Sequence, residues 1–181
     1  MKKMLSIIGI ALILTGCSIG NMDNTPTKKV EKYLNEYQTL DSNVLTKLDS
    51  IVDQEELFDD DQKITYKDIL KKHYQDLVYK VKEETINGDK ATVEVEIEVS
   101  DYTKALKQAE DYKIDNESEF LNDNGVFDEN KFSEYKLNLL KDNKERVKYT
   151  IYFSLTKTDG EWILDELTQT EQEKILGIYE Y

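Results

Sequence analysis

A single cysteine stands near the N-terminus of this chain, at the end of the sequence Leu14-Thr15-Gly16-Cys17. A cysteine sulfur can form a disulfide, ligate a metal ion or be modified covalently. Because the chain has one cysteine, an internal disulfide and a site built from several thiolates are excluded. The chemistry left to Cys17 is covalent modification of its own sulfur.

The residues before this cysteine have the composition of a secretory signal. Lys2 and Lys3 provide a positive start, and an apolar run of 11 residues follows from Met4 to Leu14. A helix that crosses a bilayer needs about 20 apolar residues, so this run is too short to hold the protein in a membrane. The four residues that end in Cys17 resemble the lipobox of bacterial lipoproteins, whose cysteine receives a diacylglyceryl group and becomes the first residue after cleavage.

The lipobox resemblance implies a signal peptide over residues 1–16, with Leu14, Thr15 and Gly16 as the cleavage motif and Cys17 as the lipidated residue. It also implies a lipid-anchored protein on the extracytoplasmic face of the cell membrane. The alternative is a plain cleaved signal peptide with a cysteine close to its end. That alternative leaves Cys17 as a free thiol, whereas a lipidated cysteine has none.

The chain is strongly acidic, because 38 Asp and Glu oppose 24 Lys and Arg to give a formal net charge of −14. Removal of residues 1–16 takes away two lysines, which leaves −16. No basic stripe is present to neutralise phosphates, so nucleic acid is excluded as a partner. An anionic leaflet repels such a body within a Debye length of about 8 Å, so we expect the lipid anchor to be the only membrane contact. The charge favours cationic protein or small-ligand partners.

We divide the chain into a signal peptide (1–16), a lipidated cysteine with a polar tether (17–27) and a single α+β domain (28–181). Thr25 and Pro26 are typical of a helix start, because a hydroxyl caps free N–H groups and proline lacks one. Apolar residues at helical spacing then predict three helices, and acidic residues 53–63 are expected to form a loop. The three apolar faces contain Val30, Tyr33, Leu34 and Tyr37; Val44, Leu45, Leu48, Ile51 and Val52; and Ile69, Leu70, His73, Tyr74 and Leu77.

Two hairpins are predicted to form the sheet. Apolar residues alternate with polar ones from Ala91 to Val99, which is typical of a strand with one buried face. The preceding strand, about residues 77–85, is joined to it by a loop that contains Asn87-Gly88. We predict a three-residue loop over 86–88, because it pairs Val81 with Val93 and Tyr79 with Val95.

The second hairpin is predicted to run from Val147 to Lys157, to turn at Asp159-Gly160 and to return through 162–167. A two-residue turn places Leu155 beside Leu164. Between the hairpins, helical spacing is found around Tyr102, Ala105, Leu106 and Ala109 and again around Phe132, Tyr135, Leu139 and Leu140. The sequence therefore predicts an α+β fold, with N-terminal helices packed on one face of a twisted antiparallel sheet made of two hairpins and a helical insertion between the hairpins.

The order of these elements, together with the turn Thr158-Asp159-Gly160-Glu161-Trp162-Ile163-Leu164, resembles the nuclear transport factor 2-like, cystatin-like cone. The resemblance covers about residues 25–178 and implies a concave sheet that can hold an apolar cavity for a small ligand. The alternative is that the same aromatic side chains fill the core. The inward-facing aromatic set implied by the cone is Tyr33, Tyr37, Tyr74, Tyr79, Tyr149, Phe153 and Trp162.

Catalytic and metal signatures are sparse. The one histidine, His73, fits a structural side chain, and no glycine-flanked nucleophile turn is present for a triad. The segment 122–125 looks like part of a calcium loop, but Phe120 and Lys131 stand where acidic ligands belong. We therefore predict no cofactor and no metal site, and we assign the run 59–61 to a solvated loop.

Three functions remain open from the sequence. The first is a non-enzymatic, lipid-anchored binding domain for an unknown protein or small ligand. The second is an enzyme of the same fold in which Glu83, the one carboxylate with the apolar parity of its strand, acts as a general base beside the cavity tyrosines. The third is a structural spacer in an envelope assembly.

Overall fold

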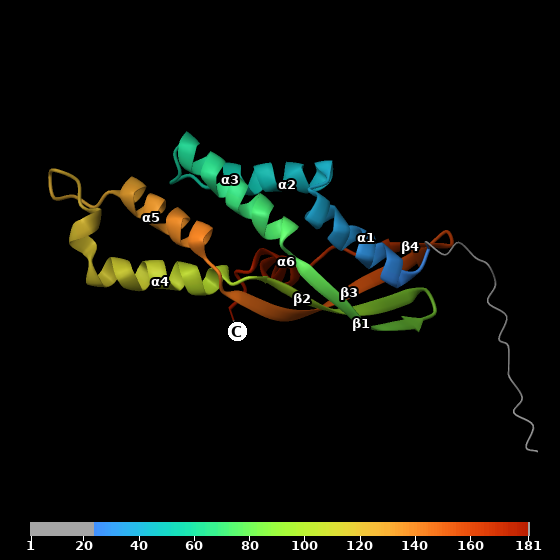
Figure 1. Cartoon of the computed structure of the whole chain (residues 1–181). Helices are drawn as coiled ribbons and strands as arrows, with labels where there is room; N and C mark the ends of the chain where they lie inside the picture. Colours follow the sequence, from blue (N-terminus) through green and yellow to red (C-terminus); the bar gives the residue numbers. More distant parts are fainter. Residues whose placement is uncertain (1–23, 181) are drawn as a thin grey trace, which may run out of the picture.

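A four-stranded antiparallel sheet with strand order β1-β2-β3-β4 forms the centre of the computed structural model, which describes residues 24–180 (Figure 1). Helices α1–α3 precede the sheet, α4 and α5 lie between its two hairpins, and α6 follows it. The predicted α+β architecture is confirmed. The helices are α1 (Pro26–Thr39), α2 (Ser42–Asp53), α3 (Asp60–Gln75), α4 (Tyr102–Asp115), α5 (Glu129–Asp142) and α6 (Gln169–Leu176), with a 3-10 turn, η1 (Glu117–Phe120). The strands are β1 (Val78–Asn87), β2 (Lys90–Ser100), β3 (Arg146–Thr158) and β4 (Glu161–Leu164).

One face of the sheet is buried because β2 and β3 alternate strictly between apolar and polar residues. The apolar residues of β2, from Ala91 to Val99, pack into one core with α1, α2, α3 and α6. The polar residues of the same strand lie on the opposite face, where Glu96 pairs with Lys82 and Glu98 pairs with Arg146. The period-two pattern therefore determines which face the helices cover.

The first hairpin differs from its prediction. Its turn contains Gly88 and Asp89, and Gly88 has a φ of +61°, the type II′ pattern of a positive φ at the first turn residue only. This turn pairs Ile86 with Ala91 instead of placing residues 86–88 in a loop. Lys82 is then an extra residue in a β-bulge, after which Val81 faces Val95 and Tyr79 faces Ile97. Val81 and Tyr79 therefore still face apolar residues of β2, but the predicted pairs Val81–Val93 and Tyr79–Val95 are wrong, because each partner lies two residues further along β2.

The second hairpin confirms its prediction. Asp159 and Gly160 have φ values of +52° and +84°, so both residues of the two-residue turn are left-handed, as in a type I′ turn. Leu155 pairs with Leu164. Asn24, the first described residue, is bound to this turn: its side-chain amide donates to Gly160 O at 2.9 Å and accepts from Trp162 N at 3.0 Å. The folded part thus includes the last residues of the expected tether.

Side-chain caps mark where the helices begin. Thr25 caps α1 and Pro26 is its first residue, as predicted. The expected loop over residues 53–63 is wrong in its second half, because Asp59 and Gln62 form a capping box and α3 begins at Asp60. The acidic run 59–61 is therefore a helix start, where negative charge is favourable.

The insertion between the hairpins has a small core of its own. Helices α4 and α5 project together from one end of the sheet, at the opposite end of the molecule from β4 and the start of α1 (Figure 1). Ala109, Phe120 and Phe132 form the buried centre of this pair, and Tyr112 stacks on Tyr135 with ring centroids 4.9 Å apart. This aromatic packing allows the pair to extend beyond the main core.

The C-terminal helix is joined to the rest of the fold at Gly177. This glycine caps α6 with a φ of +71°, and its carbonyl accepts hydrogen bonds from the backbone N–H groups of Tyr102 and Thr103 at 2.9 and 3.1 Å. On the other side, Nε2 of His73 is 2.8 Å from Ile175 O. The end of α6 is thus bound to both α3 and the start of α4.

Candidate functional site

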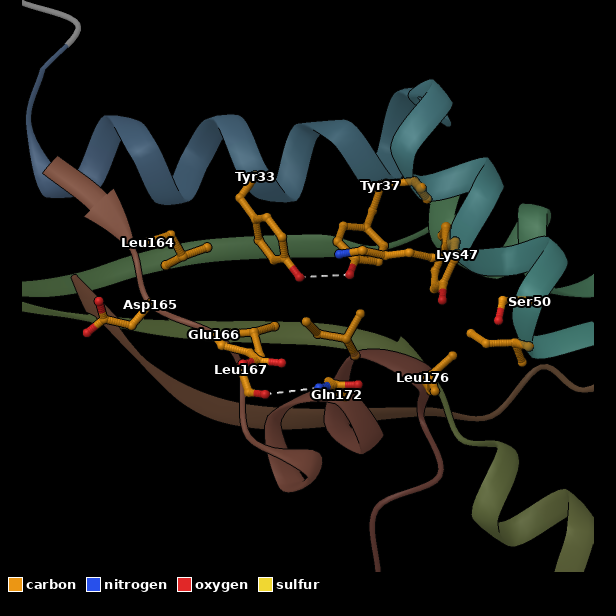
Figure 2. Close-up of a pocket in the computed structure, with 14 residues that line it drawn as sticks. Tyr33, Tyr37, Lys47, Ser50, Leu164, Asp165, Glu166, Leu167, Gln172 and Leu176 are labelled. Carbon is orange, nitrogen blue, oxygen red and sulfur yellow. Dashed lines mark hydrogen bonds between the residues drawn. The ribbon is translucent and has the colours of Figure 1, made fainter. Parts of the chain in front are cut away.

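A cleft of about 580 Å³ lies between α1 and α2 on one side and the segment from β4 to α6 on the other (Figure 2). This volume is within the range of small-molecule sites, about 300–1,000 Å³. The cleft is lined by Tyr33, Tyr37, Val44, Lys47, Ser50, Ile51, Tyr74, Leu164, Asp165, Glu166, Leu167, Gln172, Ile175 and Leu176.

Three tyrosines form an aromatic wall. Tyr33 and Tyr37 are four residues apart on α1, so both point to the same side of the helix, and their hydroxyl oxygens are 2.8 Å apart (Figure 2). The ring of Tyr37 meets that of Tyr74, from α3, edge to face with centroids 4.8 Å apart. Helical spacing thus predicted the first pair, and the packing of α3 on α1 adds the third ring.

Burial keeps these phenols protonated. Desolvation raises the pKa of Tyr33, Tyr37 and Tyr74 above its usual value of 10, and for Tyr33 the neighbouring Tyr37 raises the pKa further. At neutral pH the three side chains therefore supply neutral aromatic faces and hydroxyl groups for hydrogen bonding. They do not supply a phenolate base.

Charged groups of both signs stand at the rim of the cleft. Nζ of Lys47, on α2, lies 5.9 Å from the centre of the Tyr33 ring, within the range of a cation–π contact. Asp165 and Glu166 follow β4 on the facing side. Asp165 accepts a hydrogen bond from the Thr156 hydroxyl at 2.8 Å. Because Thr156 has the polar-face parity of β3, this bond directs the Asp165 carboxylate away from the rings and leaves Glu166 as the acidic residue that lines the cleft with Lys47.

The other aromatic residues of the predicted set do not line this cleft. Phe153 is fully buried beneath the cleft, with its ring centroid 6.1 Å from that of Tyr33. Tyr149 is buried and donates its hydroxyl to Tyr179 O at 3.1 Å. Both residues fill the core, as the alternative interpretation of the aromatic set expected.

Trp162 and Tyr79 occupy two further places. Trp162 is buried on β4, and Nζ of Lys157 lies 5.5 Å from its ring centre. Tyr79 is half-buried on β1 and donates its hydroxyl to Asn35 Oδ1 of α1 at 3.0 Å. The predicted set is therefore divided between a cleft wall, a filled core and the contact of β1 with α1.

The inward placement of Glu83 is wrong. Glu83 is exposed and faces Glu94, because the bulge at Lys82 shifts it to the polar side of β1. Its neighbour Glu84 faces Val93 instead and accepts hydrogen bonds from the backbone N–H and the hydroxyl of Thr27 at 2.9 and 2.6 Å. Neither carboxylate is among the residues that line the cleft of Tyr33, Tyr37 and Tyr74, which we name the tyrosine cleft.

The polar residues at the rim of the cleft were not predicted from the sequence. Asp165 and Glu166 directly follow the end of a strand, and polar residues at strand ends are a usual source of site residues. Lys47 and Gln172 carry no such signal, because only the packing of α2 and α6 brings them to the cleft. Within residues 24–180, no group of three His, Cys, Asp or Glu side chains is placed to hold a metal ion.

The comparisons with known proteins concern the N-terminus. No curated protein and no solved structure matches the chain significantly. Over the described residues, none of the helices has the length and apolar character to cross a membrane. Cys17 and its motif lie outside the described residues. Residues 1–18 match the prokaryotic membrane lipoprotein lipid attachment site, which supports a bacterial lipoprotein that is associated with the membrane through a lipid anchor.

Proposed function

We propose that this lipoprotein is a non-enzymatic binding protein on the extracytoplasmic face of the membrane, and that its tyrosine cleft takes a cationic group on an apolar body. The ligand is a small molecule or a side chain of a protein partner. The observation that carries the proposal is the aromatic wall of Tyr33, Tyr37 and Tyr74 in a cleft that is also lined by the acidic residue Glu166.

The aromatic wall and the acidic residue of the cleft both favour a positively charged ligand. The faces of aromatic rings attract cations, by about 0.5–1 kcal/mol at exposed sites and more when the cation is desolvated. Lys47 already takes such a position over Tyr33, so a ligand ammonium group would compete with a side chain of the protein itself. The net charge of −14 adds long-range attraction for a cation.

Three probes that share one aromatic ring test the preference for charge. Benzyltrimethylammonium, benzyl alcohol and benzenesulfonate carry a positive, zero and negative charge. We expect the cation to bind about fivefold more tightly than the alcohol, and the sulfonate to bind most weakly. The measurement is the shift of backbone amide signals of α1 and α6 in NMR titrations. Equal affinities for the three probes would remove the basis for a cationic ligand.

Two substitutions at the rim are expected to change the affinity in opposite directions. Glu166→Gln lowers the affinity for benzyltrimethylammonium about threefold, and Lys47→Met raises it about threefold, because each changes one charge near the ring wall. Glu56→Gln is the matched control, because it removes one exposed carboxylate away from the cleft. A control that weakens binding as much as Glu166→Gln would indicate that only net charge matters.

The lipid anchor has its own test. Cys17→Ala is expected to abolish incorporation of labelled fatty acid and to release the protein from the membrane fraction, because no other segment is proposed to hold it there. Metabolic labelling with palmitate and cell fractionation measure both effects. Labelled, membrane-bound Cys17→Ala protein would contradict the assignment of this residue.

The anchor also suggests an orientation. Asn24 is bound to the β3–β4 turn, and only six residues separate it from Cys17. The seven Cα-to-Cα steps from Cys17 to Asn24 span at most about 25 Å. We therefore propose that the hairpin end of the sheet faces the membrane and that the α4–α5 pair, at the opposite end in Figure 1, points away from it.

The relationship to the nuclear transport factor 2-like cone is retained as a proposal. It is supported by the order of elements, with helices first and two antiparallel hairpins after them. The insertion of α4, η1 and α5 between the hairpins is a departure from that compact pattern. The function proposed above depends on the cleft and not on this relationship.

A further inference from the structure

A second cleft, of about 340 Å³, shares no lining residue with the tyrosine cleft. It lies between α3, the C-terminal end of α5 and the segment that joins β2 to α4. Its floor is apolar and its rim is charged. The lining residues are Thr65, Asp68, Ile69, Lys72, His73, Asp76, Ser100, Tyr102, Leu140, Lys141, Asn143 and Lys144.

His73, one of the lining residues of this cleft, carries an unsatisfied acceptor. Only 1% of the side chain is exposed, and its Nε2 is 2.8 Å from Ile175 O. A carbonyl oxygen can only accept, so Nε2 carries the proton and donates it. In the neutral ring, Nδ1 is then a bare acceptor, and it is buried without a hydrogen-bond partner. Burial of an unsatisfied acceptor is unfavourable, which favours a donor that enters from the cleft.

The rim of the cleft carries an excess of positive charge. Lys72 pairs with Asp76 at 2.7 Å, and Asp68 pairs with Lys71 at 3.1 Å, so both carboxylates at the rim are compensated. Lys141 and Lys144 are exposed and form no ion pair within the part of the chain that the structure describes. Two uncompensated ammonium groups at one rim are notable in a chain with a net charge of −14.

We propose that this second cleft binds a small organic anion that also carries a hydroxyl group. The anionic group contacts the ammonium groups of Lys141 and Lys144 at the rim, and the hydroxyl donates to Nδ1 of His73 inside. The carbon skeleton packs on Ile69, Leu140 and Tyr102. This site is distinct from the tyrosine cleft, which favours the opposite charge.

The chain has one histidine, so labelling with ¹⁵N-histidine gives a single ring to observe. Four probes separate the two chemical requirements: glycerol 3-phosphate and 3-hydroxybutyrate have both groups, ethyl phosphate has only the anion, and glycerol has only hydroxyls. In the mature chain (17–181) with Cys17→Ser, we expect the first two to shift the Nδ1 signal with dissociation constants near about 1 mM. Ethyl phosphate and glycerol leave this signal in place.

The lysines are tested by the double variant Lys141→Met/Lys144→Met, which is expected to weaken glycerol 3-phosphate at least about tenfold. Lys32→Met/Lys107→Met is the control, because it removes the same charge from exposed positions outside this cleft. Three results would each overturn the proposal: no Nδ1 shift with either hydroxylated anion, an equal shift with glycerol, or equal weakening in both double variants. The first means that water alone satisfies Nδ1, and the last that binding depends only on net charge.

Discussion

Replacement of Gly177 by alanine is expected to lower the free energy of unfolding by at least about 3 kcal/mol. The φ of +71° is unfavourable for any residue with a Cβ, and a Cβ at this position would lie 2.1 Å from the carbonyl oxygen of Ser100. Since Ser100 O belongs to the backbone, it cannot rotate away. The end of α6 would have to move off the start of α4 and lose the hydrogen bonds that Gly177 O accepts. Urea denaturation of the mature chain measures the change.

Gly125 provides a matched control for this substitution. Its φ of +74° is nearly the same, but a Cβ at this position would meet no atom within 4 Å. Gly125→Ala should therefore lower the free energy of unfolding only by the cost of a left-handed backbone with a Cβ, about 1–2 kcal/mol. If the two variants lose the same stability, the close approach of Gly177 to Ser100 is not a cause of the loss.

Acid is expected to destabilise the protein through His73. The pKa of His73 is lowered from its usual value of 6.5 to about 4, mainly by burial and also by the charge of Arg146, whereas the bond to Ile175 O and the charge of Asp76 oppose the shift. The other rings packed on it, Tyr74 and Tyr102, are uncharged at these pH values.

The direction of this pH effect follows from how many protons the folded and unfolded states bind. Between pH 6.5 and 4 the unfolded chain protonates this histidine and the folded chain does not, so the stabilisation is complete above pH 6.5 and is lost as the pH falls to about 4. The difference in pKa corresponds to about 3 kcal/mol. His73→Gln removes the titration but retains a donor toward Ile175 O, so its free energy of unfolding should fall less between pH 7 and 4. Parallel pH profiles of the two proteins would contradict this account.

The first hairpin shows how far register can be predicted from sequence. Alternation in β2 correctly indicated which residues are buried, because a period of two follows from backbone geometry alone. The partner strand has a bulge at Lys82, and several combinations of turn and bulge place Val81 in the sheet. Only the packing of β1 against α1, where Glu84 binds Thr27, distinguishes them. The same shift moved Glu83 to solvent and removed the catalytic role that its parity had suggested.

The tyrosine cleft was predictable in the part that lies on one helix. Tyr33 and Tyr37 share a face because of the helical repeat, and this is a local property. Tyr74 belongs to the aromatic set that the cone resemblance implies, but its place in the wall depends on how α3 packs on α1. The rim residues Asp165 and Glu166 depend on how the segment after β4 packs there, which no local pattern encodes. Phe153 was predicted with the tyrosines because it is also aromatic, but it lies in the core. The type of a side chain alone does not show whether it lines a cleft or packs inside the protein.

By itself, the sequence determined where the protein is attached and what class of fold it has. The lipid attachment motif is a short contiguous stretch, and helical and strand periods are properties of neighbouring residues, so both are readable without a structure. Tertiary structure decided the chemistry of the two clefts. Both sites combine residues from helices and strands far apart in the chain, and the bare Nδ1 of His73 arises only because α6 brings Ile175 O to its other nitrogen. Long-range packing therefore determines the ligand chemistry that we propose.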